Sequence, residues 1–222
     1  MVLGPIFAAV QSTSRRGLEA VARSRSYAEG EALFLQGNRP SHMLLLTTGR
    51  VKVWRATESG VALTLTLVGP GALIGTLGAA HDRPHAATAT ALTQVEALTW
   101  PLDDLRRLMR QDGALAMDIL LTLARYAEQV IERVEEVSVL PLEQRLARTL
   151  VRMAEGAGGD GGPPAMDLPL SRQDLADLTS ATLPAVSRIM SVWRTDGLIA
   201  GRRGRVEILD MNGVRGIGFP AR

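Results

Sequence analysis

The chain has 222 residues, of which 46% are hydrophobic and 22% charged, and its formal net charge is only +2. This composition favours a packed protein of one large or two smaller domains over a disordered chain. Because the sequence has no cysteine, disulfides, thiolate zinc sites, cysteine-ligated iron–sulfur clusters and cysteine nucleophiles are excluded.

The amino-terminal stretch MVLGPIFAAVQSTSRRG has no basic region ahead of its apolar run, and Gly4-Pro5 interrupts that run. It therefore does not resemble a secretory signal. No apolar stretch reaches the ~18 residues of a membrane-spanning helix. We expect a cytoplasmic protein without a membrane partner.

Residues 1–26 are interpreted as a helical lead-in. From Tyr27 to Trp100, short β-favouring runs such as HMLLLTTG, RVKVWRA, VALTLTLV and VEALTW alternate with glycines. Strands at this spacing with glycine turns indicate an antiparallel sandwich or barrel. The alternation of apolar and hydroxyl residues in ALTLTLV predicts a strand with one buried face.

The pattern becomes helical after Trp100. Pro101 is expected at the first position of a short helix, and Asp112 or Gly113 at the start of a long one. In the long segment, apolar residues recur at intervals of four and three through three heptads, as in a coiled-coil seam. This seam either packs on the chain's own sheet or pairs two subunits, and we favour the pairing. Its members are Ala116, Leu120, Leu123, Ala127, Val130, Val134 and Val137.

A second helix, LEQRLARTLVRMAE, is expected after Pro141, followed by GAGGDGGPPAMD, which has the composition of a loop. In the next segment, LSRQDLADLTSATLPAVSRIM, Ser171 is an N-cap candidate with Asp174 forming an imperfect capping box. Residues 179–181 predict a tight turn, and Thr182 is expected to cap a second helix. Two short helices around such a turn indicate a helix-turn-helix.

The stretch IAGRRGRVEIL reads as two short strands around a basic turn. From Arg188 to Arg205 there are five arginines and one acidic residue, Asp196. A basic hairpin beside a helix-turn-helix suits contacts with DNA phosphates. The alternative is an unrelated helical hairpin with a solvated basic loop.

Taken together in this order, the segments resemble the Crp/Fnr family of bacterial transcription regulators. YAEGEALFLQGNRPSHMLLLTTGRVKVW resembles its opening β-roll, LPLEQRLARTLV its stretch after the hinge, and LSRQDLADLTSATLPAVSRIM with DGLI and RGRVEILD its winged helix-turn-helix. The resemblance runs from about residue 5 to 213. It implies an α+β fold, with an antiparallel β-roll of the cyclic-nucleotide-binding type in residues 1–111, a long dimerisation helix and hinge in 112–140, and a winged helix-turn-helix in 141–222.

The resemblance also implies a homodimer on palindromic double-stranded DNA, with recognition helices in major grooves about 34 Å apart. It favours an activator, and residues 156–164 lie where relatives contact RNA polymerase. Arg188 matches the family arginine that contacts guanine or phosphate. Pro184 replaces a glutamate that often reads cytosine, so the half-site is expected to differ. The expected DNA-binding residues are Ser171, Arg172, Gln173, Thr182, Leu183, Ala185, Ser187, Arg188, Arg202, Arg203 and Arg205.

Residues 71–90, GALIGTLGAAHDRPHAATAT, resemble the phosphate cradle of relatives that bind cyclic AMP, without its charges. Thr76 stands where relatives have a ribose-binding glutamate, and His85-Ala86 where they have Arg-Ser. Since each charge-assisted hydrogen bond contributes about 1.5–3 kcal/mol, we expect that the protein does not use cyclic AMP and has no cofactor. Arg83 could take the place of the missing phosphate-binding arginine only if the loop shifted by two residues. The vestigial pocket comprises Gly75, Thr76, Leu77, Arg83, His85, Ala86, Val130 and Ile131.

Two other functions remain open. The chain could sense a different small molecule in the roll, with the DNA-binding module responding to it. It could also be a metal-dependent hydrolase using His81, Asp82 and His85, whose spacing is compatible with a metal site. No nucleophile–base pair or carboxylate pair accompanies these residues, so we expect neither a catalytic site nor a bound metal.

Overall fold

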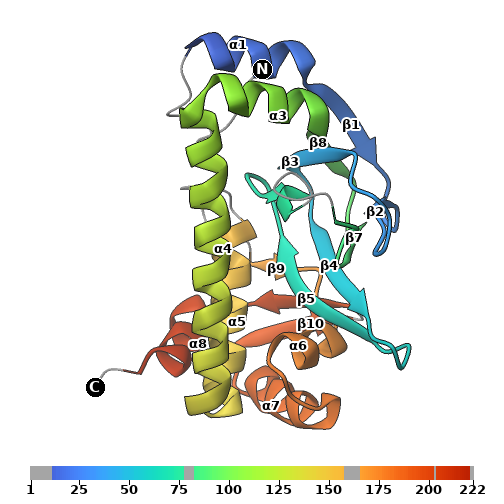
Figure 1. The fold of residues 1–222 in the computed structure, drawn as a ribbon. Helices are drawn as coiled ribbons and strands as arrows, with labels where there is room; N and C mark the ends of the chain where they lie inside the picture. Colours follow the sequence, from blue (N-terminus) through green and yellow to red (C-terminus); the bar gives the residue numbers. More distant parts are fainter. Residues whose placement is uncertain (1–11, 78–82, 158–165, 203, 221–222) are drawn as a thin grey trace.

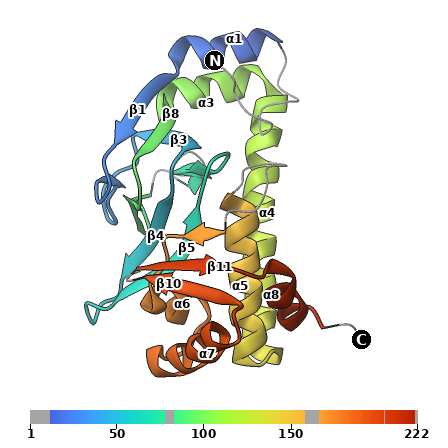
Figure 2. The same ribbon diagram turned by 180° about the vertical axis from the view of Figure 1, so that it is seen from behind.

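The computed structural model describes residues 12–77, 83–157, 166–202 and 204–220. These residues form an amino-terminal β-roll, a long helix α4 (Gly113–Val139) beside it, and a carboxy-terminal module of helices and short strands (Figure 1, Figure 2). The predicted fold class, α+β with a roll, a long helix and a winged helix-turn-helix, is thereby confirmed.

The roll consists of two antiparallel four-stranded sheets. One sheet has the order β1 (Arg23–Tyr27), β8 (Val95–Pro101), β3 (His42–Thr48) and β6 (Leu73–Ile74). The other has the order β2 (Ala32–Phe34), β7 (Thr88–Ala91), β4 (Val51–Ala56) and β5 (Ala62–Val68). The core between them is made of small and branched apolar side chains such as Ala89, Ala91 and Val95, in keeping with the low aromatic content.

The helical lead-in is shorter than expected from the sequence. Ser12–Val21 form helix α1, but Arg23–Tyr27 form β1, which pairs with β8 along its whole length. Four of its five residues are exposed. A polar edge strand of this kind is specified by its partner strand rather than by its own periodicity. Residues 1–11 lie outside the described part.

Strand β3 explains the apolar run in HMLLLTT. Leu44 and Leu46 face the core between the sheets, whereas Met43 and Leu45 pack under helices on the outer face. A strand buried on both faces gives a continuous apolar run instead of alternation. The turn that follows needs Gly49, which has φ +81° and where a Cβ would lie 2.2 Å from the Gln94 carbonyl oxygen.

Helices α1, α3 (Leu102–Gln111) and the start of α4 cover that outer face (Figure 1). Pro101 was predicted as the first helical residue of α3 but occupies its N-cap position, one residue earlier, because it is also the last residue of β8. The sequence placed Asp112 or Gly113 at the start of α4, and Asp112 is its N-cap: the Asp112 side chain accepts a hydrogen bond from the Ala114 N–H.

The carboxy-terminal module contains more elements than the sequence indicated. Its elements are α5 (Leu142–Ala157), β9 (Asp167–Leu168), α6 (Arg172–Leu178), α7 (Leu183–Thr195), β10 (Ile199–Arg202), β11 (Arg205–Ile208) and α8 (Met211–Gly218). Neither β9 nor α8 was predicted. Helix α8, MNGVRGIG, is rich in glycine and poor in helix propensity, and its packing on α5 compensates: Arg148 donates to the Gly218 carbonyl at 2.8 Å.

Helices α4 and α5 are joined by a buried acidic residue. Glu136 of α4 is 7% exposed and accepts a 2.6 Å hydrogen bond from Arg152 of α5. Arg148, one turn earlier on α5, lies 3.6 Å from the same carboxylate. This face of α4 is therefore committed to the carboxy-terminal module of its own chain.

Candidate nucleic-acid interface and ligand cavity

The first helix of the helix-turn-helix begins with a complete capping box, where the sequence had indicated an imperfect one. The Ser171 hydroxyl accepts from the Asp174 N–H at 3.0 Å, and the Asp174 carboxylate accepts from the Ser171 N–H at 2.9 Å. Although aspartate is shorter than the glutamate of the usual motif, its carboxylate still reaches the N–H of the N-cap residue. The Ser171 side chain is engaged in this cap.

The turn and the second helix also lie where the sequence placed them. Ser180 in the turn has φ +51°, and α7 begins directly after Thr182. Thr182 occupies the N-cap position, but its side chain makes no capping hydrogen bond, which corrects its predicted role. The inner face of α7 packs into the module core through Val186, Met190 and Trp193.

Strands β10 and β11 form the expected basic hairpin, and β9 extends it to a three-stranded sheet. Arg205 makes a bidentate ion pair with Asp167, with the shortest contact at 2.8 Å. Hydrogen bonding to Arg205 lowers the pKa of the Asp167 carboxyl. Arg205 is thus held in place at the base of the hairpin turn.

Four of the predicted DNA-binding residues, Ser171, Arg172, Arg202 and Arg205, line one groove of the structure. Ser171, Ala185 and Ser187 are half-buried, and Arg203 lies outside the described residues. The groove, of about 410 Å³, joins the helix-turn-helix to the wing, and it also contains Arg194 from the last turn of α7, which was not among the predicted residues. The exposed members of the predicted set are Arg172, Gln173, Thr182, Leu183, Arg188, Arg202 and Arg205.

Helix α4 exposes a long apolar stripe. Five of the seven predicted seam residues are exposed in the single chain, whereas α4 buries other residues, including Leu115 and Ile119, against the protein. Only Leu123 and Ala116 of the seam are half-buried. We call the exposed set the α4 stripe; it includes Met117, Leu120, Leu121, Ala127, Val130, Ile131, Val134 and Val137.

A cavity of about 700 Å³ lies between the roll and α4. It contains every residue of the predicted vestigial pocket except Ile131, which is 66% exposed and belongs to the α4 stripe. The remaining walls are mainly aliphatic, and no acidic residue of the described part lines them. The position expected to hold a ribose-binding carboxylate is Thr76, which is buried.

His85 belongs to the wall of this cavity. Its ring stacks on Phe34 with centroids 4.1 Å apart, and burial lowers its pKa, which favours the neutral imidazole at pH 7. Position 75 requires glycine for two local reasons. A Cβ there would lie 2.9 Å from the His42 carbonyl oxygen, and the backbone φ is +78°. Gly75 is thus required by its backbone conformation and by local packing, independently of any phosphate.

The described residues contain no group of three or more metal-ligating side chains. Two members of the metal hypothesis, His81 and Asp82, lie outside them. None of the helices in the described ranges has the length and apolarity needed to cross a bilayer.

Comparison with known proteins gives matches to two family models. Residues 24–112 match the cyclic nucleotide-binding domain, and residues 144–217 match the Crp-like helix-turn-helix domain. A CRP-like cAMP-activated global transcriptional regulator of Mycobacterium tuberculosis is 23% identical over 195 residues, 87% of each chain. The nitrogen fixation regulation protein FixK of Rhizobium meliloti is 26% identical over 193 residues, 86% of this chain and 85% of the relative.

The solved structure of FixK2 from Bradyrhizobium japonicum superposes with a TM-score of 0.75 at 18% identity, covering 91% of this chain and all of that one. A nucleotide-type roll joined through a long helix to a winged helix-turn-helix defines a DNA-binding transcription regulator. With both domain matches in this order, the chain belongs to the Crp/Fnr family. The relative from Mycobacterium tuberculosis is named as a transcriptional regulator and the relative from Rhizobium meliloti as a regulation protein.

Proposed function

We propose that this regulator binds a palindromic DNA site as a homodimer and does so without cyclic AMP. The observation that carries the second part is the chemistry of the cavity. By the family resemblance, Thr76 and His85 stand where cyclic-AMP-binding relatives carry the ribose-binding carboxylate and the phosphate-binding guanidinium, and both residues line the cavity. A cyclic nucleotide would find there neither a carboxylate for its ribose nor a guanidinium at the His85 position, and Arg83 alone among the described lining residues would be left to face its phosphate.

The α4 stripe supports the homodimer. It is long, contiguous and exposed in the single chain, and such patches on soluble proteins mark interaction surfaces. Its heptad spacing suits a second copy of the same helix. The opposite face of α4 is already occupied by the roll and by α5.

The remaining parts of the proposal rest on the family. We propose an activator that contacts RNA polymerase near residues 156–164 and works in the cytoplasm, where its DNA partner is found. The division into residues 1–111, 112–140 and 141–222 is part of the same proposal, as are the absence of enzymatic activity and the individual DNA contacts.

Selection from random duplex DNA tests this proposal directly. The purified full chain is expected to enrich a palindromic motif with no nucleotide added, and cyclic AMP at millimolar concentration should leave both the motif and the affinity unchanged. Each lost charge-assisted contact weakens the nucleotide by about tenfold or more. A motif that emerges only with cyclic AMP would overturn the assigned roles of Thr76 and His85.

A second candidate function is the sensing of an apolar ligand. The volume of the cavity lies within the usual range of ligand pockets, about 300–1,000 Å³, and its walls are mostly aliphatic. Arg83 lines it and makes no hydrogen bond or ion pair with another residue of the described part. Apolar walls around one such cation suit an apolar carboxylate.

Thermal unfolding with fatty and aromatic carboxylates distinguishes this candidate from ligand-free action. A carboxylate that binds the folded chain at 100 times its Kd stabilises it by about 2.7 kcal/mol, which corresponds to a rise of several degrees in Tm. Arg83→Gln should abolish the rise. A flat response to the whole panel, with DNA binding intact, would leave ligand-free action as the function.

A further inference from the structure

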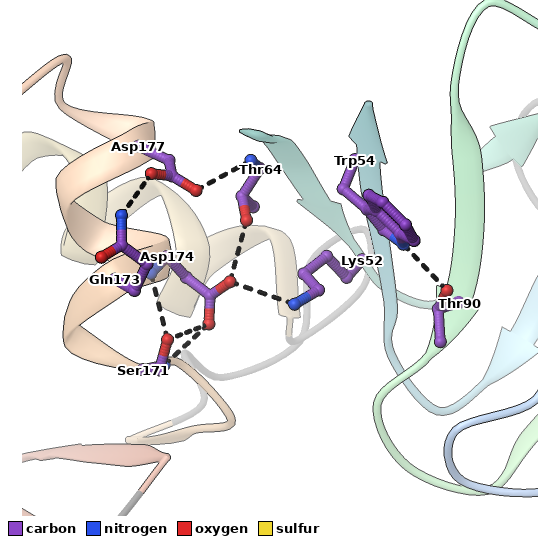
Figure 3. Close-up of polar contacts among 8 residues, drawn as sticks. All are labelled: Lys52, Trp54, Thr64, Thr90, Ser171, Gln173, Asp174 and Asp177. Atoms are coloured by element: carbon purple, nitrogen blue, oxygen red, sulfur yellow. Dashed lines mark hydrogen bonds and ion pairs between the residues drawn. The ribbon is translucent and has the colours of Figure 1, made fainter. Parts of the chain in front are cut away.

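The helix-turn-helix is bonded to the β-roll of its own chain through two carboxylates of α6 (Figure 3). The Thr64 hydroxyl on β5 donates to Asp174 Oδ1 at 2.9 Å, and Lys52 Nζ on β4 lies 3.3 Å from the same oxygen. One helical turn later, Asp177 accepts the Thr64 N–H at 2.9 Å. Helix α6 is thus attached to strands more than a hundred residues away in the sequence.

These bonds satisfy a carboxylate that has little access to water. Asp174 is 7% exposed and Thr64 is 5% exposed. Burial opposes ionisation, but hydrogen bonds from Ser171 and Thr64, with the charge of Lys52, hold the pKa of the Asp174 carboxyl below its usual value. One carboxylate oxygen serves the capping box and the other serves the roll, so moving α6 off β5 would leave Oδ1 without these partners.

Arg133 ties a third element into the same contact. It extends from α4, and its guanidinium donates to the Leu65 carbonyl of β5 and, at 2.8 Å, to the Leu178 carbonyl at the end of α6. Burial and the nearby charge of Arg152 lower its pKa. A planar guanidinium can satisfy two carbonyls in fixed directions at once. The side chain lines the cavity, where it bonds to backbone of both the roll and the helix-turn-helix.

This contact leaves the DNA-facing surface uncovered. Helix α7 lies on the far side of α6 from the roll (Figure 1, Figure 2). Arg172, Leu183 and Arg188 remain exposed while α6 is docked. The contact therefore fixes where the recognition helix stands relative to α4 without competing with DNA.

We propose that Lys52, Thr64 and Arg133 are positioning residues that hold the helix-turn-helix in its DNA-binding place without a ligand and thereby set the half-site spacing that the dimer accepts. We call these residues, with Asp174 and Asp177, the interdomain latch. The proposal rests on the homodimer and palindromic site proposed above. Two recognition helices held rigidly to paired α4 helices lie a fixed distance apart, whereas loosely attached modules tolerate several spacings.

The test measures DNA affinity as a function of half-site spacing. The full chain, its Thr64→Val and Arg133→Gln variants, and a matched Arg107→Gln control on exposed α3 are titrated against the selected palindrome with zero, one or two base pairs added or removed at its centre. One base pair rotates the half-sites by about 35° relative to each other. Thermal unfolding of each variant confirms that it is folded.

The wild-type chain and the control should prefer one spacing by at least about tenfold over its neighbours. In Arg133→Gln, and to a smaller extent in Thr64→Val, this preference should fall to about threefold or less, with affinity at the best spacing lowered about tenfold. A merely structural role would weaken all spacings equally and keep their ratio.

Two results would overturn the proposal. An unchanged spacing ratio in both variants would show that the latch does not position the module. A gain in affinity at the preferred spacing would show that the latch restrains DNA binding. Failure of the proposed palindrome binding by a homodimer would look different. The wild-type chain itself would then show no spacing optimum, and both proposals would be wrong.

Discussion

Replacing Arg188 with alanine should lower the affinity for the selected palindrome by roughly a hundredfold, because each subunit loses one base contact of about 1–3 kcal/mol. Arg188 lies exposed on α7, the helix expected in the major groove. Its removal leaves the buried face of α7, formed by Val186, Met190 and Trp193, untouched. Fluorescence anisotropy with labelled duplexes measures the loss.

Two matched variants separate this loss from a change in charge. Arg110→Ala, on the exposed last turn of α3, removes the same charge far from the interface and should leave affinity unchanged. Arg202→Ala on the wing should weaken specific and random duplexes alike and reduce the salt dependence by about one unit. Wild-type affinity of Arg188→Ala for the palindrome, with the dimer intact, would remove Arg188 from the recognition set.

Placing two aspartates on the α4 stripe should give the second large effect, conversion to a monomer with loss of DNA binding at nanomolar concentrations. Leu120 and Ile131 are 57% and 66% exposed in the single chain and neither lines the cavity. Leu120→Asp with Ile131→Asp would bury unpaired carboxylates between the helices, at about several kcal/mol for each ion. We expect the dimer dissociation constant to rise by roughly a thousandfold or more.

Sedimentation velocity and circular dichroism report on this change separately. Helical content should stay at the wild-type level, because both side chains point to solvent in the single chain. Leu35→Asp, at a 49% exposed leucine before Gln36 on the roll, is the matched control and should stay dimeric. A dimer that survives both aspartates would show that the stripe serves another partner.

Local chemistry made much of the DNA-binding module predictable. Ser171 and Asp174 specify a helix start within four residues, and Asp112 specifies the start of α4 in the same way. The heptad spacing identified most of the α4 stripe, because residues on one face of a helix recur in the sequence with the helical period. By contrast, Met117 and Leu121 widen the stripe beyond the strict seam, and only the three-dimensional exposure reveals them.

Contacts between distant segments could not be predicted. The sequence identifies Asp174 as a capping residue, but its second oxygen bonds to Thr64, 110 residues away. Strand β9 has two residues and takes its conformation from β11. The stacking of His85 on Phe34 likewise depends on how β2 meets the loop before β7. These features depend on tertiary geometry, which overrides local propensity.

The two faces of helix α4 serve different contacts, and this has a thermodynamic consequence. One face carries the α4 stripe, and the other carries Arg133 and Glu136, which bind the DNA-binding module of the same chain. If self-association and operator binding both act through this helix, the two equilibria are linked. The factor by which operator tightens association must then equal the factor by which association tightens operator binding. The amount of the regulator in the cell would itself become a signal, with occupancy rising more steeply than concentration.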